Sequence, residues 1–76
     1  MENIKEMVKE DIKKHLDNWK KYCFTLECTV TTGPLMEKYK VSALFVDMLL
    51  KELCNEYGLQ CTHHWLAEEI KFYITN

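Results

Sequence analysis

Apolar residues recur every three or four positions through the first third of the chain. This is the spacing of one face of an α-helix, and it predicts a helix from about Asn3 to Tyr22. The opposite face is charged, with Lys5, Lys9 and Lys13 placed four apart among acidic residues, and we interpret it as solvent-exposed. The apolar stripe consists of Ile4, Val8, Ile12, Leu16, Trp19 and Cys23.

The period then changes to two. Phe24, Leu26, Cys28 and Val30 alternate with polar residues in a stretch rich in β-branched and aromatic types, which predicts a strand with these four on its apolar side. Thr32-Gly33-Pro34 ends this strand and opens a short helix.

The short helix is expected from about Pro34 to Tyr39, since proline is tolerated in the first turn of a helix. It would present Leu35, Met36 and Tyr39 to the core.

A longer helix is predicted between Ser42 and Gly58. A serine side chain caps the first turn of a helix, and glycine readily adopts the left-handed conformation that ends one. The apolar stripe of this helix consists of Val46, Leu49, Leu50, Leu53 and Tyr57.

The C-terminal segment has two interpretations. Alternation over Leu59 to Trp65 and over Ile70 to Thr75 indicates two strands. The connection 66–69, however, has no glycine for a tight turn, and the stretch from His64 to Lys71 is also compatible with a helix. We favour the hairpin, because the first strand otherwise has no partner.

These elements predict an α+β fold in a single domain over residues 1–76, since a chain of this length has room for one core. Over about residues 31–75 their order resembles the winged helix-turn-helix superfamily. The stretch 35–42 resembles the turn of that motif, and Gly58-Leu59 resembles the step into its hairpin, or wing. Val46, Leu50 and Leu53 match core positions of its recognition helix. The resemblance implies a function in binding nucleic acid.

The charge pattern opposes that function for duplex DNA. The chain has ten lysines, no arginine and twelve acidic residues, for a net charge of −2. Arginine is the usual reader of guanine and the preferred clamp for phosphate. Residues 1–22 hold six lysines and five acidic residues, whereas residues 23–76 hold four and seven. The half that resembles the DNA-binding motif is therefore the acidic half.

The predicted recognition helix carries apolar residues where a major groove would lie. Asp47 would repel phosphate, and only Lys51 would attract it, whereas Leu44, Phe45 and Met48 are typical of a protein contact surface. We therefore expect a small non-catalytic regulator or inhibitor of the kind that phages and mobile elements encode. It would bind a nucleic-acid-handling protein, or a second copy of itself, through these five residues. The alternative is that the first helix covers the apolar cluster.

Binding of single-stranded nucleic acid is the competing function. It requires a groove lined by lysines and aromatic faces for the bases, and it does not depend on arginine. The candidate residues are Lys20, Lys21, Lys38, Tyr39, Lys40, Trp65, Lys71 and Tyr73.

The remaining candidates for chemistry are Cys23, Cys28, Cys54, Cys61, His63 and His64. The first two cysteines are separated by four residues and the last two by six, which fits the usual zinc spacings poorly. The two histidines would point to opposite faces of a strand, and no nucleophile or carboxylate pair is spaced for acid–base catalysis. We expect no enzymatic activity, no metal and no cofactor.

The compartment is inferred from apolar runs. The charged first residues do not resemble a secretory signal, and the longest apolar run, Ala43 to Val46, is far below the ~20 residues that cross a bilayer. We expect a cytoplasmic protein with reduced cysteines and no membrane partner.

Overall fold

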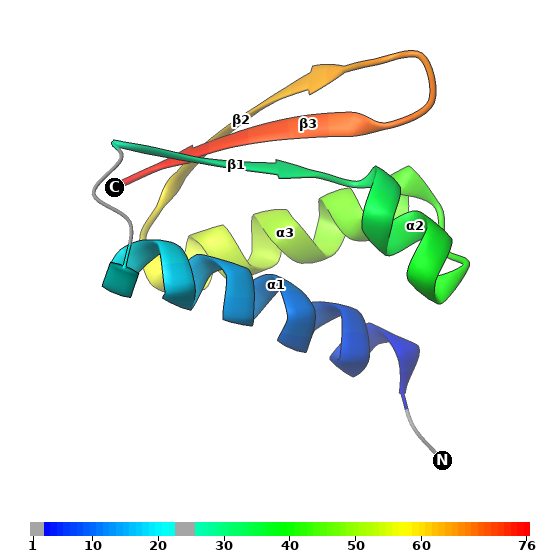
Figure 1. The fold of residues 1–76 in the computed structure, drawn as a ribbon, viewed down its shortest axis with the longest axis horizontal. Coiled ribbons are helices and arrows are strands. Elements are labelled where there is room, and N and C mark those ends of the chain that lie inside the picture. The colour runs from blue at the N-terminus through cyan, green and yellow to red at the C-terminus, as the bar shows by residue number, and fades with distance from the viewer. Residues whose placement is uncertain (1–2, 23–25) are drawn as a thin grey trace.

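The computed structural model describes residues 3–22 and 26–76, which form the predicted α+β fold. Helix, strand, short helix, longer helix and a pair of strands follow one another in the expected order. The elements are α1 (Ile4–Tyr22), β1 (Glu27–Thr31), α2 (Gly33–Tyr39), α3 (Ala43–Tyr57), β2 (Gln60–Trp65) and β3 (Ile70–Thr75). The sheet forms one layer, and α1 and α3 lie on the same side of it (Figure 1).

The sheet confirms the hairpin and explains the first strand. Its order is β1-β3-β2, and both neighbours run antiparallel to the central β3. Thr32 prolongs the pairing of β1 with β3, because its backbone N–H donates to the Ile70 carbonyl oxygen at 3.0 Å and its Oγ1 accepts from the Ile70 N–H at 2.9 Å. Thr32 is fully buried, so these two hydrogen bonds to Ile70 satisfy polar atoms that would otherwise have to bind water.

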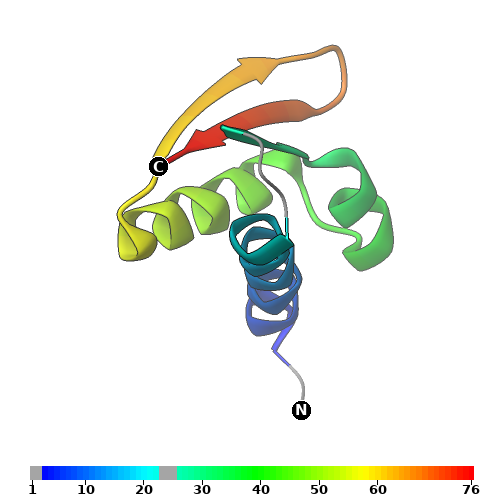
Figure 2. The same cartoon turned by 60° about the vertical axis from the view of Figure 1, so that its left-hand side comes forward.

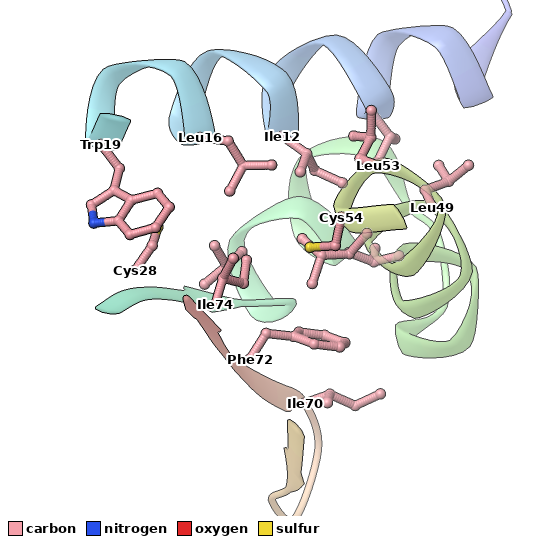
Figure 3. Packing of buried hydrophobic residues seen from close by; sticks show 14 residues of the cluster. Ile12, Leu16, Trp19, Cys28, Leu49, Leu53, Cys54, Ile70, Phe72 and Ile74 are labelled. Atoms are coloured by element: carbon pink, nitrogen blue, oxygen red, sulfur yellow. The ribbon is translucent and has the colours of Figure 1, made fainter. Parts of the chain in front are cut away.

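The core lies between the sheet and the two long helices (Figure 3). The predicted stripe of α1 is buried from Val8 to Trp19, whereas Ile4 is exposed at the N-terminal end and Cys23 lies outside the described residues. The predicted stripe of α3 is buried as well, except for Tyr57, which is half-buried. The buried apolar residues are Val8, Ile12, Leu16, Trp19, Cys28, Val30, Val46, Leu49, Leu50, Leu53, Cys54, Ile70, Phe72 and Ile74.

The placement of Leu26 in the first strand was wrong. The strand begins at Glu27, and the Leu26 side chain is 91% exposed. Glu27 pairs with Thr75, the last residue of β3, so β3 offers no residue opposite Leu26. Phe24, predicted on the same apolar side, lies outside the described residues.

The ends of the two C-terminal helices confirm the predicted signals. Pro34 lies in the first turn of α2. Ser42 caps α3, since its Oγ accepts the Phe45 N–H at 3.2 Å, and Gly58 ends it in the left-handed conformation at φ 68°. Lys40 also adopts a positive φ, 55°, and so forms the tight turn between α2 and α3.

Candidate protein-interaction surface

The two faces of α3 differ sharply in burial. The inward face is sealed in the core, whereas Leu44 and Met48 on the outward face are 63% and 52% exposed. These two residues lie one helical turn apart and therefore belong to one patch. Of the two alternatives for this cluster, the structure shows that α1 leaves Leu44 and Met48 uncovered.

Phe45 lies apart from this outward patch. Its side chain is half-buried and packs against the core cluster, and its backbone N–H is held by Ser42. Among the three predicted apolar contact residues, Leu44 and Met48 are therefore the ones available to a partner. We call them the α3 patch.

Asp47 and Lys51 flank the α3 patch as an ion pair. Lys51 Nζ lies 3.2 Å from Asp47 Oδ1, a buried oxygen that accepts no hydrogen bond from the described residues. The Asp47 side chain is only 15% exposed, and the lysine charge compensates part of its desolvation. The pair leaves little net charge beside the patch, so Lys51 is not a spare cation for phosphate.

The surface continues from α3 onto β2. Cys61 packs against the core that α3 helps to form, and this burial raises the pKa of its thiol. Cys61 and His63 lie opposite the buried Ile74 and Phe72, so they are on the helix-facing side of the sheet. The His63 and Phe72 ring centroids are 5.8 Å apart.

Trp65 and Leu66 add apolar surface at the far end of the hairpin. Trp65 is 57% exposed and alternates onto the same side of β2 as His63. Figure 1 shows this end of the hairpin at the same end of the molecule as α2 and the start of α3. Leu66 was not among the predicted site residues. Its apolar character just before the two glutamates of the turn was the available signal.

The turn of the hairpin, residues 66–69, is acidic. A hollow between it and the α2–α3 turn is lined in part by Lys40, Val41, Glu68 and Glu69. The Glu69 carboxylate lies against Gly33 at the start of α2, where a Cβ would collide with it. This turn is the segment that resembles the tip of a wing, and its two carboxylates would repel a phosphate backbone.

Lys38 and Tyr39 are occupied within the fold. Both bind Asp11 of α1, with Lys38 Nζ 3.1 Å from Asp11 Oδ2 and the Tyr39 hydroxyl donating to the same oxygen. The hydrogen bond from Tyr39, helped by Lys38, lowers the pKa of the Asp11 carboxyl. These two predicted nucleic-acid residues therefore tie α2 to α1. Asp11 was missed because its partners lie 27 and 28 residues away along the chain.

The other predicted nucleic-acid residues do not gather into one groove. Lys71 Nζ lies 5.4 Å from the centroid of the Tyr73 ring on the outer face of the sheet, whereas Trp65 is on the helix-facing side. Lys20 lies over the Tyr57 ring at 5.5 Å, and Lys21 is its neighbour near the end of α1. Figure 1 shows that end opposite the α2 end of the molecule. Lys40 lies beside the acidic turn instead.

The cysteines and histidines do not form a reactive centre among the described residues. Burial raises the pKa of the Cys54 thiol to about 12, so it stays protonated and weakly nucleophilic near neutral pH. His63 and His64 lie opposite Phe72 and Lys71, hence on the two faces of the sheet, as predicted. Within ranges 3–22 and 26–76, no three His, Cys, Asp or Glu side chains are arranged to hold a metal ion.

Among residues 3–22 and 26–76, no helix has the length and apolar character needed to cross a membrane.

Searches against protein-family models, curated proteins and solved structures give no match for this chain. The resemblance to the winged helix-turn-helix superfamily therefore stays a prediction.

Proposed function

We propose that this chain is a small non-catalytic module that regulates or inhibits another cytoplasmic protein by binding it through the α3 patch. The exposure of Leu44 and Met48 carries the proposal, because α3 already buries a stripe from Val46 to Cys54 on its other side. Apolar side chains left outside the core of a small domain often mark a contact surface, and methionine adapts to irregular partners.

The charges near the start of α3 indicate the chemistry of the partner. Glu37, Glu68 and Glu69 line the hollow between α2 and the hairpin turn, where Lys40 is the one cation among the lining residues of the described chain. A partner suited to this end has an apolar pocket with basic residues at its rim. Such a basic rim is typical of proteins that handle nucleic acid, which agrees with a regulator of the phage or mobile-element kind.

Photo-crosslinking in cells of the organism that encodes the chain tests the proposal. A benzophenone amino acid replaces Leu44 or Met48 in turn, with exposed Asn18 of α1 as the matched control position. We expect one discrete heavier product from the two α3 positions and none from position 18. Loss of that product on adding Met48→Gln to the position 44 variant would place the contact on the patch.

Two results would overturn the proposal. The first is the absence of a product from positions 44 and 48, or the same product from position 18. The second is a product with twice the mass of the chain, which would make self-association the function of this patch.

Nucleic-acid binding is the competing function, and the order of helices and strands is the observation that favours it. Fluorescence anisotropy with single-stranded and duplex oligonucleotides across a salt series separates the two. Tight binding that weakens steeply with salt would replace the protein-binding proposal, because counterion release accompanies phosphate contact. We expect no binding at about 50 mM salt, where phosphate contacts are strong.

A further inference from the structure

Strand β2 forms one open edge of the sheet. It pairs with β3 on one side, and in the described part of the chain no strand pairs with its other side. Figures 1 and 2 both show this outer side of the hairpin clear of the three helices. A strand in this position offers its outward backbone groups to another chain.

The hydrogen-bond pattern shows which groups point outward. The Leu66 N–H donates to the Glu69 carbonyl oxygen at 2.8 Å, whereas the N–H and carbonyl of Ile70 both bind Thr32 on the other side of β3. Hydrogen-bonded and non-hydrogen-bonded pairs alternate along an antiparallel ladder. Residues 60, 62 and 64 therefore bond to β3, and Cys61, His63 and Trp65 direct their backbone N–H and carbonyl groups to the open edge.

Nothing in the sequence of β2 protects this edge. Natural edge strands commonly carry lysine, proline, a bulge or an inward-pointing charge that blocks further pairing. Gln60–Trp65 contains no lysine, proline, glycine or carboxylate, and its pairing with β3 is continuous over all six residues.

We propose that two copies of the chain associate through β2 as antiparallel strands around a twofold axis at His63. In this register His63 pairs with His63 of the second copy. Cys61 of each copy pairs with Trp65 of the other copy. Each hydrogen-bonded pair exchanges two bonds, so this one register uses the outward groups of all three residues in each strand. The product is one continuous sheet with β2 and its copy at the centre.

Self-complementarity favours a second copy over an unrelated strand. A twofold axis brings the same surface of each copy together, so any charged side chain near the axis meets the same charge on the second copy. β2 carries no lysine or carboxylate, and the identical side chains that meet at the axis are the two His63 imidazoles. The exposed Trp65 would also gain cover, since it would lie beside Cys61 of the second copy. The edge consists of backbone groups of β2, whereas the α3 patch consists of the side chains of Leu44 and Met48, so His63→Pro tests this proposal and leaves both patch side chains in place.

Sedimentation equilibrium over micromolar to millimolar concentrations tests the association. His63→Pro removes an outward N–H and leaves the ladder with β3 intact. His64→Ala is the matched control, because its backbone bonds to β3 and its side chain lies on the other face of the sheet. We expect the wild type and His64→Ala to dimerise, and His63→Pro to weaken the dimer about tenfold or more. Circular dichroism checks that each variant is folded.

His63→Cys keeps the test decisive should the proline unfold the hairpin. Directly opposed residues of a hydrogen-bonded pair have Cα atoms about 5.5 Å apart, which is within the range of a disulfide. Mild oxidation should therefore link two copies of His63→Cys, and it should not link wild type or His64→Cys beyond background. A wild type that stays monomeric, a dimer unaffected by His63→Pro, or equal linking of both cysteine variants would overturn the proposal. A photo-crosslinked product of positions 44 and 48 that persists in the His63→Pro variant would belong to the α3 patch and not to this association.

Discussion

The two long helices, α1 and α3, bury similar stripes in one core but differ on their outward faces. Val8, Ile12 and Leu16 of α1 are as inaccessible as Leu49 and Leu50 of α3. Outside that core, α1 carries lysines and acidic side chains along its length and exposes Ile4 and Tyr22 only at its two ends, whereas α3 exposes the α3 patch. The inward stripes account for the fold, and the outward apolar residues of α3 call for a different explanation.

The charges of α1 are used inside the monomer. Lys9 Nζ lies 3.5 Å from Glu52 Oε1 and 3.6 Å from Glu56 Oε1 of α3, and Asp11 binds Lys38 and Tyr39 of α2. Burial works against the charge on Lys9, but the attraction of the two glutamates outweighs it and raises the pKa of Lys9. The polar face of α1 thus fastens the helices together, while the outward ion pair of α3 is internal to that helix.

Truncating the core should have the largest effect and should affect both helices alike. Leu16→Ala and Leu50→Ala each remove a fully buried side chain, and each should lower the free energy of unfolding by about 2–5 kcal/mol. A domain of this size has about 5 kcal/mol to lose, so either variant should be largely unfolded at 37 °C. Urea denaturation followed by circular dichroism measures both. A cost below about 1 kcal/mol at one position would show that its helix lies outside the common core.

Removing an N-terminal cap should lower the free energy of unfolding by less than a core truncation does, and the loss should differ between the two helices. Asn3 Oδ1 accepts the Lys5 N–H at 2.9 Å at the start of α1, as Ser42 Oγ accepts the Phe45 N–H in α3. Ser42→Ala should cost about 1 kcal/mol. Asn3→Ala should cost less, because the first turn of α1 carries the exposed Ile4 and can fray without opening the core. Ser42→Asp, which keeps a capping oxygen, is the control, and equal costs at both caps would contradict this difference.

The bounds of the elements were predictable where a local signal sets them. Periodicity located α1, and Ser42 and Gly58 fixed α3. The hairpin followed from a pairing requirement rather than from its turn, since β1 needed β3 beside it. For the two long helices, the decisive residues are neighbours in sequence or belong to one repeating pattern.

Features set by distant residues could not be predicted. Leu26 continues the apolar alternation, yet it is exposed because the pairing of β3 stops at Thr75. Leu44 and Met48 are exposed because the core packs against the opposite face of α3, whereas Phe45 of the same apolar cluster is half-buried against that core. The sequence also does not signal the positive φ of Lys40 between α2 and α3. The sequence therefore predicted which residues belong to the candidate site, but it did not predict which of their side chains are exposed and which face the core.

The attachment of α1 to α2 should depend on pH. The Tyr39 hydrogen bond, helped by Lys38, lowers the pKa of Asp11 in the folded state, so its contribution is complete above the ordinary carboxyl pKa. It should disappear as the pH falls through the lowered pKa. Tyr39→Phe should therefore be less stable than wild type at neutral pH, although the loss should be smaller than that of a core truncation. The difference between Tyr39→Phe and wild type should shrink in acid. Thermal unfolding from pH 7 down to pH 2 measures it, with Tyr73→Phe as control. A difference independent of pH would contradict the role of Asp11.

The smallest effect on stability is expected at the patch that distinguishes α3 from α1. Met48→Gln and Leu44→Gln should change the free energy of unfolding by no more than about 0.5 kcal/mol, because more than half of each residue is already exposed to solvent. Leu49→Gln is the matched control one residue further on, where the same amide would enter the core and cost several kcal/mol, of the order of 3. Chemical denaturation of dilute protein measures all three. A large loss for Met48→Gln that grows with protein concentration would mean that a second copy already covers the patch. A large loss that is independent of concentration would mean that the monomer needs it, and α3 would then have no outward face to offer a partner.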